Sequence, residues 1–388
     1  MKTLKIGLLP KILIAMFIGT LVGLGLEAVK LEFIARIFVT VNGIFSEFLG
    51  FAIPLIIVGL VTTAIADIGN RAGKMLLTTV IIAYGSTIIA GLVSYLTGAA
   101  LFPSMIQHGT SLQTVTEVSD LSPFFTVSIP PLMGVMTALV LAFTIGLGLA
   151  STQNETLLKA THGFEEIIVK TIKTAIIPVL PLYIFGIFLS MAYVGKVFSI
   201  LVVFIKIIGI IFLIHIGILL LQFIIAGAVS KKNPFKLLVN MLPAYFTALG
   251  TQSSAATIPV TLEQTRKNGV SEDVAGFTIP LCATIHMSGS TLKIVACALA
   301  LMIMQGMPYD FGMFAGFICM LGITMVAAPG VPGGAIMASL GLLAGMLGFS
   351  PEAQGLMIAL YIAMDSFGTA CNVTGDGAIA VIIDRIFK

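Results

Sequence analysis

The most constraining feature of this sequence is a series of long apolar segments, each of which can cross a lipid bilayer as one helix. The segments are Ile12–Val29, Phe45–Ile68, Leu76–Phe102, Pro131–Ala150, Ile168–Tyr193 and Val197–Val229. A helix needs about 20 mostly apolar residues to cross the hydrocarbon core of a bilayer. Because 58% of the 388 residues are hydrophobic and only 10% are charged, the chain is predicted to be an all-α, polytopic integral membrane protein.

The composition also argues against several classes of function. The formal net charge of +3 is too small to indicate a nucleic-acid partner. The four cysteines lie inside apolar segments without a CxxC spacing, so we expect packing residues rather than disulfides. The sequence contains no Walker-type phosphate loop, which disfavours direct driving by ATP. We expect no organic cofactor.

Basic residues alternate between the connections, and this pattern predicts the orientation in the membrane. One set of connections holds Lys2, Lys5, Lys11, Arg71, Lys74, Lys159, Lys170, Lys231, Lys232, Lys236, Arg266, Lys267, Arg385 and Lys388. The opposite set holds little beyond Lys30, Arg36 and Lys196. By the positive-inside rule, both termini are predicted to be cytoplasmic. The first apolar segment lacks a clear A-x-A cleavage site, so we expect a retained helix rather than a signal peptide.

The C-terminal half differs, because its apolar segments are short and interrupted by small and polar residues. Two apolar arms meet at "TQSSAAT" (Thr251–Thr257), and two more meet at "AAPGVPGG" (Ala327–Gly334). Each pair of arms is followed by a helix with polar residues in its middle. We expect these two helices to break within Thr284–Ser290 and Thr369–Asp376. The order hairpin, broken helix, hairpin, broken helix is typical of an inverted repeat around a midplane binding site.

The physical reason for such a site lies in the backbone. The N–H and C=O groups freed by a non-helical segment cannot face lipid without a cost of several kcal/mol each. They must face protein, ions or a bound solute instead. The interruptions therefore predict a pocket for cations and a small polar solute.

Four of these motifs together resemble the dicarboxylate/amino acid:cation symporter family of glutamate, aspartate, neutral amino acid and serine/threonine transporters. "TQSSAATIP" resembles its first hairpin tip, "ATIHMSGS" its unwound helix, "GVPGGAIM" its second tip and "NVTGDG" its last helix. The resemblance implies eight transmembrane helices plus two re-entrant helical hairpins, in the glutamate-transporter-homologue fold. It also implies a homotrimer in the plasma membrane of a prokaryote, its cell inner membrane, with a small amino acid as substrate.

The resemblance further implies a static scaffold and a mobile transport domain. The expected scaffold comprises residues 1–73 (helices 1 and 2) and 105–195 (helices 4 and 5). The expected transport domain comprises residues 74–104 (helix 3) and 196–388. Within the second part we expect helix 6, hairpin 1 (about 234–269), broken helix 7 (about 274–305), hairpin 2 (about 311–347) and helix 8 (about 351–387).

Asp376 is the leading candidate for a sodium ligand. It lies four residues after Asn372, hence on the same helical face, and an intramembrane carboxylate is costly unless it faces a partner or a cavity. The resemblance implies one sodium site made by Asp376 and the carbonyls of Asn372, Cys282 and His286. It implies a second site made by the carbonyls of Thr284, Met287, Val326 and Ala328. About two sodium sites are therefore expected, and the alternative for Asp376 is a structural ion pair with Lys293.

The resemblance assigns the substrate to a neighbouring set of residues. Asp365 would bind an amino group and Asn372 a carboxylate, and the alternative for Asp365 is a cap on a kinked helix. The expected substrate-binding residues are Gln252, Ser253, Ser254, Ser290, Lys293, Val331, Gly334, Asp365, Gly368, Thr369 and Asn372.

A departure from the family pattern bears on the substrate. Members that carry acidic substrates have an Arg three residues after the aspartate, whereas this chain has Gly368. A neutral amino acid is therefore the leading prediction. Lys293 leaves an acidic amino acid or a dicarboxylate as the alternative, because it shares a helical face with Ser290 and could anchor a carboxylate. It could instead stand in for a cation or carry a proton.

A second departure concerns the number of cations. The family's third sodium site needs an Asp and an Asn, where this chain has Ser288 and His286, and polar partners in the third helix, where we compare Val80, Ala83 and Tyr84. We expect that site to be absent. His286 leaves proton coupling open, since His is the side chain that titrates near neutral pH.

The expected mechanism is secondary active symport by alternating access, with the tip Ala327–Gly334 as the gate. No enzyme activity is expected. Two competing hypotheses are an intramembrane serine protease, which "HMSGS" beside "TQSS" could suggest, and a passive channel lined by carbonyl groups.

Overall fold

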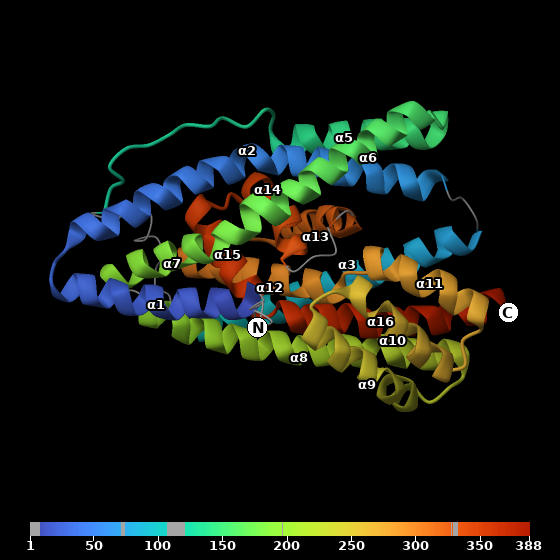
Figure 1. Cartoon of the computed structure of the whole chain (residues 1–388). Coiled ribbons are helices and arrows are strands. Elements are labelled where there is room, and N and C mark those ends of the chain that lie inside the picture. Colours follow the sequence, from blue (N-terminus) through green and yellow to red (C-terminus); the bar gives the residue numbers. More distant parts are fainter. Residues whose placement is uncertain (1–7, 71–73, 107–120, 196, 327, 329–332) are drawn as a thin grey trace, which may run out of the picture.

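A computed structural model describes the chain except residues 1–7, 71–73, 107–120, 196, 327 and 329–332. The described residues form helices and no strand, as Figure 1 shows. The elements are α1 (Leu8–Ala28), α2 (Glu32–Asn70), α3 (Lys74–Met105), α5 (Val135–Thr152), α6 (Glu155–Thr171), η1 (Ile172–Ile176), α7 (Ile177–Tyr193), α8 (Val197–Ser230), α9 (Pro234–Thr251), α10 (Ser254–Lys267), α11 (Glu272–Ile285), α12 (Ser288–Gln305), α13 (Phe311–Val326), α14 (Gly334–Leu347), α15 (Pro351–Ala363) and α16 (Asp365–Phe387). The prediction of an all-helical membrane fold is confirmed.

Each of the six long apolar segments forms a helix, but several of these helices exceed the apolar segment that predicted them. α2 begins at Glu32 rather than at Phe45, and the helix predicted from Ile168 begins at Glu155, because α6, the π-helical turn η1 and α7 follow one another without a gap. Hydropathy marks only the part of a helix that lies in hydrocarbon. Backbone hydrogen bonding continues into the charged turns beyond it.

Hairpin 1 consists of α9 and α10, which meet at Gln252 and Ser253. Gln252 has a left-handed backbone with φ of 53°, and the Ser253 side chain accepts a hydrogen bond from the Ala256 N–H at the start of α10. The capping serine and the left-handed residue turn the chain within two residues. α9 packs against α16 and α8, whereas α10 packs against α11 and α16.

Hairpin 2 consists of α13 and α14. Most of its predicted tip lies outside the described residues, apart from Ala328, Gly333 and Gly334. α14 begins after Gly333, whose φ of 75° is a backbone conformation that favours glycine. α13 packs against α3, and α14 packs against α2 and α15.

Both interrupted helices are present, but one break was predicted at the wrong place. α11 and α12 are separated at His286 and Met287, inside the predicted range. The other break is at Met364, between α15 and α16, and α16 runs unbroken through Thr369–Asp376. In that range Asn372 bonds sideways to α12 and Thr369 bonds back to its own helix, which leaves the backbone ladder intact.

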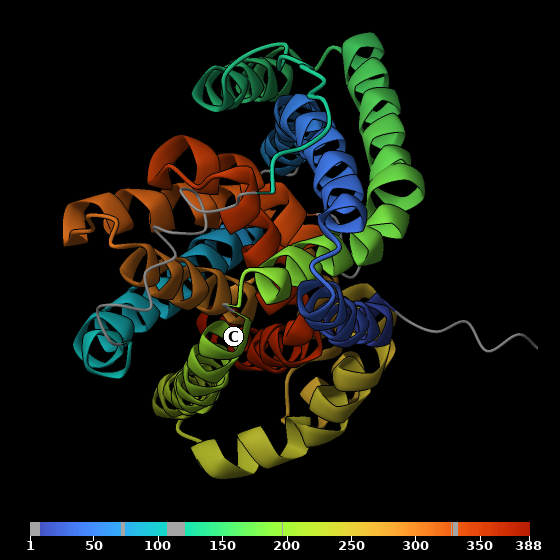
Figure 2. The same cartoon turned by 90° about the vertical axis from the view of Figure 1, so that its left-hand side faces the viewer.

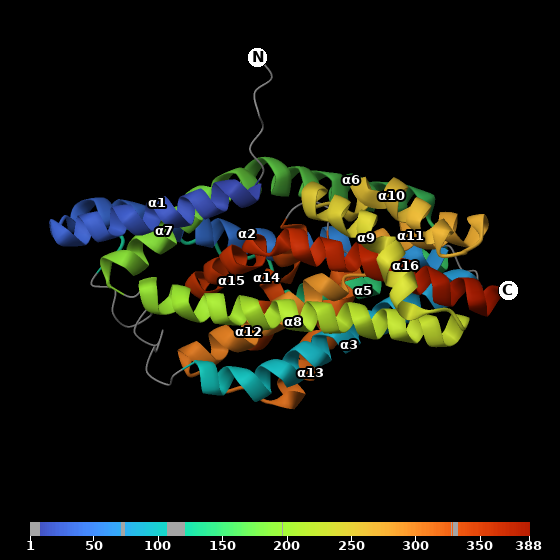
Figure 3. The same cartoon turned by 90° about the horizontal axis from the view of Figure 1, so that it is seen from below.

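The helices divide into two packed groups. α1 packs along α7, and α2 packs along α5, α6 and α7. Figures 1 and 2 show α2, α5 and α6 on one side of the molecule and α8 and α9 on the opposite side. Figure 3 shows α3, α12, α8 and α16 running beside one another, in agreement with their contacts. This grouping is compatible with a scaffold and a transport domain, an assignment that stays a prediction.

Two glycines spaced by four residues bring α1 and α7 into backbone contact. A Cβ atom at Gly19 would lie 2.5 Å from the Phe185 carbonyl oxygen, and one at Gly23 would lie 2.3 Å from the Leu189 carbonyl oxygen. Such small-residue pairs are typical of closely packed membrane helices.

We therefore expect Gly23→Ala to destabilise the protein by about 1–3 kcal/mol, because the added methyl meets backbone that cannot rotate away. The measurement is the thermal unfolding midpoint in detergent. Gly25→Ala on the same helix is the control, since nothing lies within 4 Å of its added Cβ. Equal midpoints for the two variants would contradict the packing described here.

Candidate substrate and cation site

The break between α11 and α12 leaves two residues outside the helical ladder. His286 has φ of −97° and ψ of 104°, and Met287 has φ of −124° and ψ of 38°. The Cys282 carbonyl accepts a hydrogen bond from the His286 N–H, and the Met287 carbonyl accepts one from the Thr291 N–H, both at 2.9 Å. Each carbonyl oxygen has a second lone pair with which it could bind a cation.

Asp376 is fully buried and is paired with His286. The distance between Nδ1 of His286 and Oδ1 of Asp376 is 2.9 Å, and both residues are 1% exposed. The alternative ion pair between Asp376 and Lys293 is therefore wrong, because Lys293 lies beside Asp365 instead. The carboxylate predicted to bind sodium is held by the His286 ring, for which the sequence analysis predicted a carbonyl ligand and left proton coupling open, but no contact with Asp376.

Two residues that sequence reasoning missed complete this cluster. Ser86 on α3 has its Oγ 3.1 Å from Nε2 of His286. Gln222 on α8 donates through Nε2 to the hydroxyls of Ser86 at 2.9 Å and of Ser288 at 3.1 Å. An amide inside the apolar segment "ILLLQFIIAG" was a signal that could have identified Gln222.

The third helix contributes at positions other than those first compared. Thr87 accepts a hydrogen bond from the Met287 N–H at 3.3 Å, whereas Tyr84 donates to the Cys319 carbonyl at 3.0 Å. The comparison made at Val80, Ala83 and Tyr84 therefore overlooked polar side chains that α3 brings to the break. The absence of a third sodium site stays a prediction.

Lys293 and Asp365 form a second buried cluster at the other break. Nζ of Lys293 donates to the Met364 carbonyl at 3.0 Å and lies 3.8 Å from Oδ1 of Asp365. It also lies 4.0 Å from the centre of the Tyr361 ring, a cation–π distance. The open helix end at Met364 thus supplies an acceptor for a buried ammonium.

Gly368 makes room for that ammonium. A Cβ atom at this position would lie 2.2 Å from Nζ of Lys293. The head group of Lys293 therefore occupies the space beside the residue where acidic-substrate relatives are expected to carry Arg. Lysine reaches this space from α12 rather than from α16.

Asn372 fastens the start of α12 to α16. Its Oδ1 accepts from the Gly289 N–H at 2.7 Å, and its Nδ2 donates to Oγ of Ser290 at 3.1 Å. Ser290 also accepts from the Tyr361 hydroxyl at 3.0 Å. Asn372 is thus placed between the cluster around Asp376 and the cluster around Asp365.

The two hairpins contribute unequally to the described site. The Gly333 N–H donates to Oδ2 of Asp365 at 2.8 Å, which places the neighbouring Gly334 at this cluster. The Thr369 hydroxyl donates to the Asp365 carbonyl at 3.1 Å. At the tip of hairpin 1, the Thr257 hydroxyl donates to the Ser253 carbonyl at 2.8 Å.

The remaining predicted residues lie at the edges of these clusters or outside them. Gln252 and Ser253 are half-buried and Ser254 is buried, all at the tip of hairpin 1. Thr284 is exposed and donates its hydroxyl to the Leu281 carbonyl, while Val326 ends α13 and Ala328 is buried. Val331 lies outside the described residues. Substrate and sodium roles for all of these residues stay predictions.

Comparison with known proteins places this geometry in a family. The model of the family described as "Sodium:dicarboxylate symporter family" matches residues 8–386. The human protein "Excitatory amino acid transporter 2" is 33% identical over 177 residues, which are 45% of this chain and 30% of that protein. The rat "Neutral amino acid transporter B(0)" is 29% identical over 161 residues, which are 40% of this chain and 29% of that protein. The aligned stretches span less than a third of the length of these relatives, and the predicted family resemblance is confirmed.

A prediction follows from the contact between Gly368 and Lys293. Gly368→Ala should destabilise the native protein by about 1–3 kcal/mol, because the methyl displaces a buried, paired ammonium. In a Lys293→Ala background the same substitution should cost much less. Thermal unfolding of the four proteins of this double-mutant cycle measures the coupling.

Gly276→Ala serves as the control, since its added Cβ meets nothing within 4 Å. Additive effects of Gly368→Ala and Lys293→Ala would mean that the two positions do not contact each other.

Proposed function

Because the chain belongs to the sodium:dicarboxylate symporter family, we propose that it couples inward sodium flux to the uptake of a small amino acid by alternating access. The observation that carries this proposal is the pair of buried clusters at the two helix breaks. One presents the carboxylate Asp376 beside open backbone, and the other presents the pair Asp365 and Lys293. A cation and a zwitterion are the solutes that such groups bind.

A neutral amino acid fits the second cluster best. The charge of Lys293 is already balanced by Asp365, and one of its protons is bonded to the Met364 carbonyl. The cluster therefore has no net charge to offer to an acidic side chain. The substrate ammonium would bind Asp365, and its carboxylate would bind Asn372 and the N–H groups near Ser253 and Ser254.

An acidic amino acid or a dicarboxylate is the second candidate, and one observation favours it. Nζ of Lys293 occupies the space beside Gly368, where it could bind a substrate carboxylate once Asp365 turns to the substrate ammonium. Lysine would then act as a point charge rather than as the planar fork that arginine provides.

Sodium is proposed to bind at about two sites. Asp376 with the carbonyls of Asn372, Cys282 and His286 would form the first site. Carbonyls of Thr284, Met287, Val326 and Ala328 would form the second. Oxygen ligands of this kind suit a hard monovalent cation. The second set is supported by the contact between α11, which carries Thr284, and α13, which carries Val326.

The remaining features of the proposal concern the assembly and its setting. The second hairpin tip would close over the substrate, and residues 74–104 and 196–388 would then move across a scaffold of residues 1–73 and 105–195. The protein is proposed to be a homotrimer in a prokaryotic plasma membrane with both termini cytoplasmic. This family is made up of transporters, which speaks against the serine-protease hypothesis, and saturable dependence on a sodium gradient would separate a carrier from a channel.

Asp376→Asn should abolish sodium-driven amino acid uptake into proteoliposomes, down to the level of protein-free liposomes. The substitution keeps the shape of the side chain but removes the charge that a sodium ion needs. Asp310→Asn is the control, because Asp310 lies outside both clusters and its side chain accepts from the Met313 N–H at the start of α13. Unaltered uptake by Asp376→Asn would remove Asp376 from the set of sodium ligands.

A thermal-shift screen of the purified protein, with every amino acid in sodium chloride or choline chloride, should identify the substrate. We expect a small neutral amino acid to raise the unfolding midpoint by several degrees only when sodium is present, because a ligand that binds the native state stabilises it. Stabilisation by aspartate or glutamate alone would favour the second candidate.

A further inference from the structure

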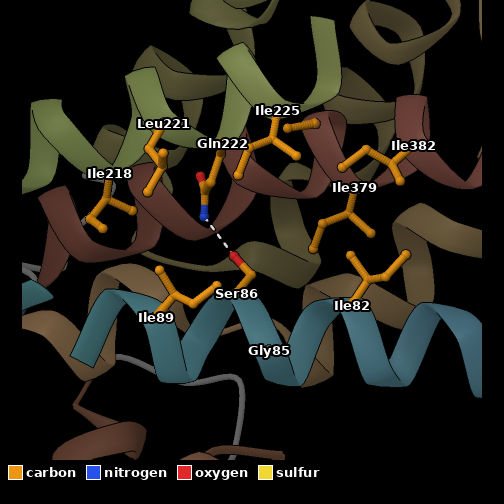
Figure 4. A pocket seen from close by; sticks show the side chains of 11 residues that line it. Ile82, Gly85, Ser86, Ile89, Ile218, Leu221, Gln222, Ile225, Ile379 and Ile382 are labelled. Carbon is orange, nitrogen blue, oxygen red and sulfur yellow. Dashed lines mark hydrogen bonds between the residues drawn. The ribbon is translucent and has the colours of Figure 1, made fainter. Parts of the chain in front are cut away.

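A chain of polar side chains, buried except for the half-buried Ser86, reaches Asp376 from the outer helices of its bundle. It starts at Gln222 on α8, passes through Ser86 on α3 and His286 at the helix break, and ends at the carboxylate (Figure 4 shows the first link). The three links measure 2.9, 3.1 and 2.9 Å. Neither Gln222 nor Ser86 belongs to the proposed sodium or substrate sites.

The chemistry of the end group fixes the direction of every link. An ionised carboxylate only accepts hydrogen bonds, so the hydrogen of a neutral His286 ring must be on Nδ1. Nε2 is then an acceptor, and the hydroxyl of Ser86 at 3.1 Å is its nearer donor, with Nε2 of Gln222 at 3.4 Å. Oγ of Ser86 consequently accepts from Nε2 of Gln222, so all three bonds point toward Asp376.

Gln222 also bonds to the start of α12, while its carbonyl oxygen has no hydrogen-bond partner among the described residues. Its second amide hydrogen is donated to the hydroxyl of Ser288, at the first residue of α12. Its carbonyl oxygen lies against Gly375, where an added Cβ would be 2.7 Å from Oε1 of Gln222 and 2.6 Å from Cε1 of His286. Gly375 therefore lets both the amide and the ring approach α16.

The outer side of this hydrogen-bonded chain of side chains is apolar. Ser86 and Gln222 line a cavity of about 250 Å³. The other lining residues are Ile82, Gly85, Ile89, Ile218, Leu221, Ile225, Ala378, Ile379 and Ile382, most of which Figure 4 shows around the two polar side chains. Because this lining offers few alternative partners, the two polar side chains direct their hydrogen bonds inward, toward His286.

We propose that Gln222 and Ser86 are positioning residues for sodium binding. They hold His286 in the tautomer and orientation in which its Nδ1–H fixes Asp376 through Oδ1, so that Oδ2 would be left for a cation. The inference rests on the proposed function, since it requires that sodium binds Asp376. Hydrogen-bond partners that orient the ligands of a metal site in this way commonly affect its affinity for the metal.

Loss of either residue has a defined physical consequence. Without the Ser86 hydroxyl as a donor, the ring can place its hydrogen on Nε2 and turn the Nδ1 lone pair toward the carboxylate. The two acceptors repel each other, and Asp376 leaves the position in which it meets sodium. Sodium should therefore bind more weakly, while the side chains around the cavity stay packed as in the native protein.

The test is a titration of purified protein with sodium chloride, at constant ionic strength in choline chloride, with the thermal unfolding midpoint as the signal. Gln222→Met keeps the volume of the side chain and removes its donors, and Ser86→Ala removes the hydroxyl. We expect each to raise the half-saturating sodium concentration by about threefold to tenfold, the change in affinity that one buried hydrogen bond produces.

Two matched controls separate positioning from packing. Ser86→Thr keeps the hydroxyl, and its methyl can enter the cavity, so the native sodium dependence should be retained. Ile225→Leu changes the cavity wall without a hydrogen bond, so it should move only the midpoint in choline. A purely structural role for Gln222 and Ser86 would likewise lower the midpoint in choline and leave the half-saturating sodium concentration unchanged.

The inference is overturned if Gln222→Met and Ser86→Ala leave the half-saturating sodium concentration unchanged or lower it. Asp376→Asn, titrated in parallel, reports on the proposed function alone. If Asp376→Asn weakens or removes the sodium response and the other two variants do not alter it, the sodium site at Asp376 stands and the positioning role fails. If Asp376→Asn keeps the native half-saturating sodium concentration, the assignment of sodium to Asp376 itself fails.

Discussion

A charge inside a bilayer must find its partner within the protein, and two buried aspartates show how this chain meets that requirement. Asp376 is paired with the imidazole of His286, and Asp365 is paired with the ammonium of Lys293. Both partners come from one broken helix, and both carboxylates come from the helix that crosses it. The two breaks expose backbone where these pairs lie, so the positions of the breaks and of the charges depend on each other.

Glycine makes that crossing close enough for the pairs to form. A Cβ atom at Gly289 would lie 2.5 Å from both the Cys371 Cβ and the Gly368 carbonyl oxygen, and one at Gly368 would overlap Lys293. α12 and α16 therefore meet backbone to backbone, and their polar side chains reach across the contact rather than along it. Because the two helices are so close, each polar side chain has only one or two partners within reach. Specific pairs therefore form, rather than a diffuse polar environment.

The sequence predicted the fold well because its signals are local. Apolar length identifies the crossing helices, and small residues between apolar arms identify the hairpins. The break at Met364 was missed because the polar run from Thr369 to Asp376 suggested unwinding, whereas Asn372 bonds sideways to α12 and Thr369 bonds back to α16. Ser86 was missed because its importance comes from contacts between helices far apart in the chain, and the amide of Gln222, although unusual in an apolar segment, does not by itself indicate its partners.

The bond from the Gly333 N–H to Asp365 has a thermodynamic consequence. Gly333 directly precedes α14, so one oxygen of Asp365 holds the start of α14, the second arm of hairpin 2. An ammonium that binds this oxygen competes with the Gly333 N–H for it. The equilibrium between conformations of the hairpin therefore depends on whether Asp365 is occupied. Linkage of this kind is reciprocal: whatever free energy the occupancy of Asp365 contributes to the position of the hairpin, the position of the hairpin contributes equally to occupancy.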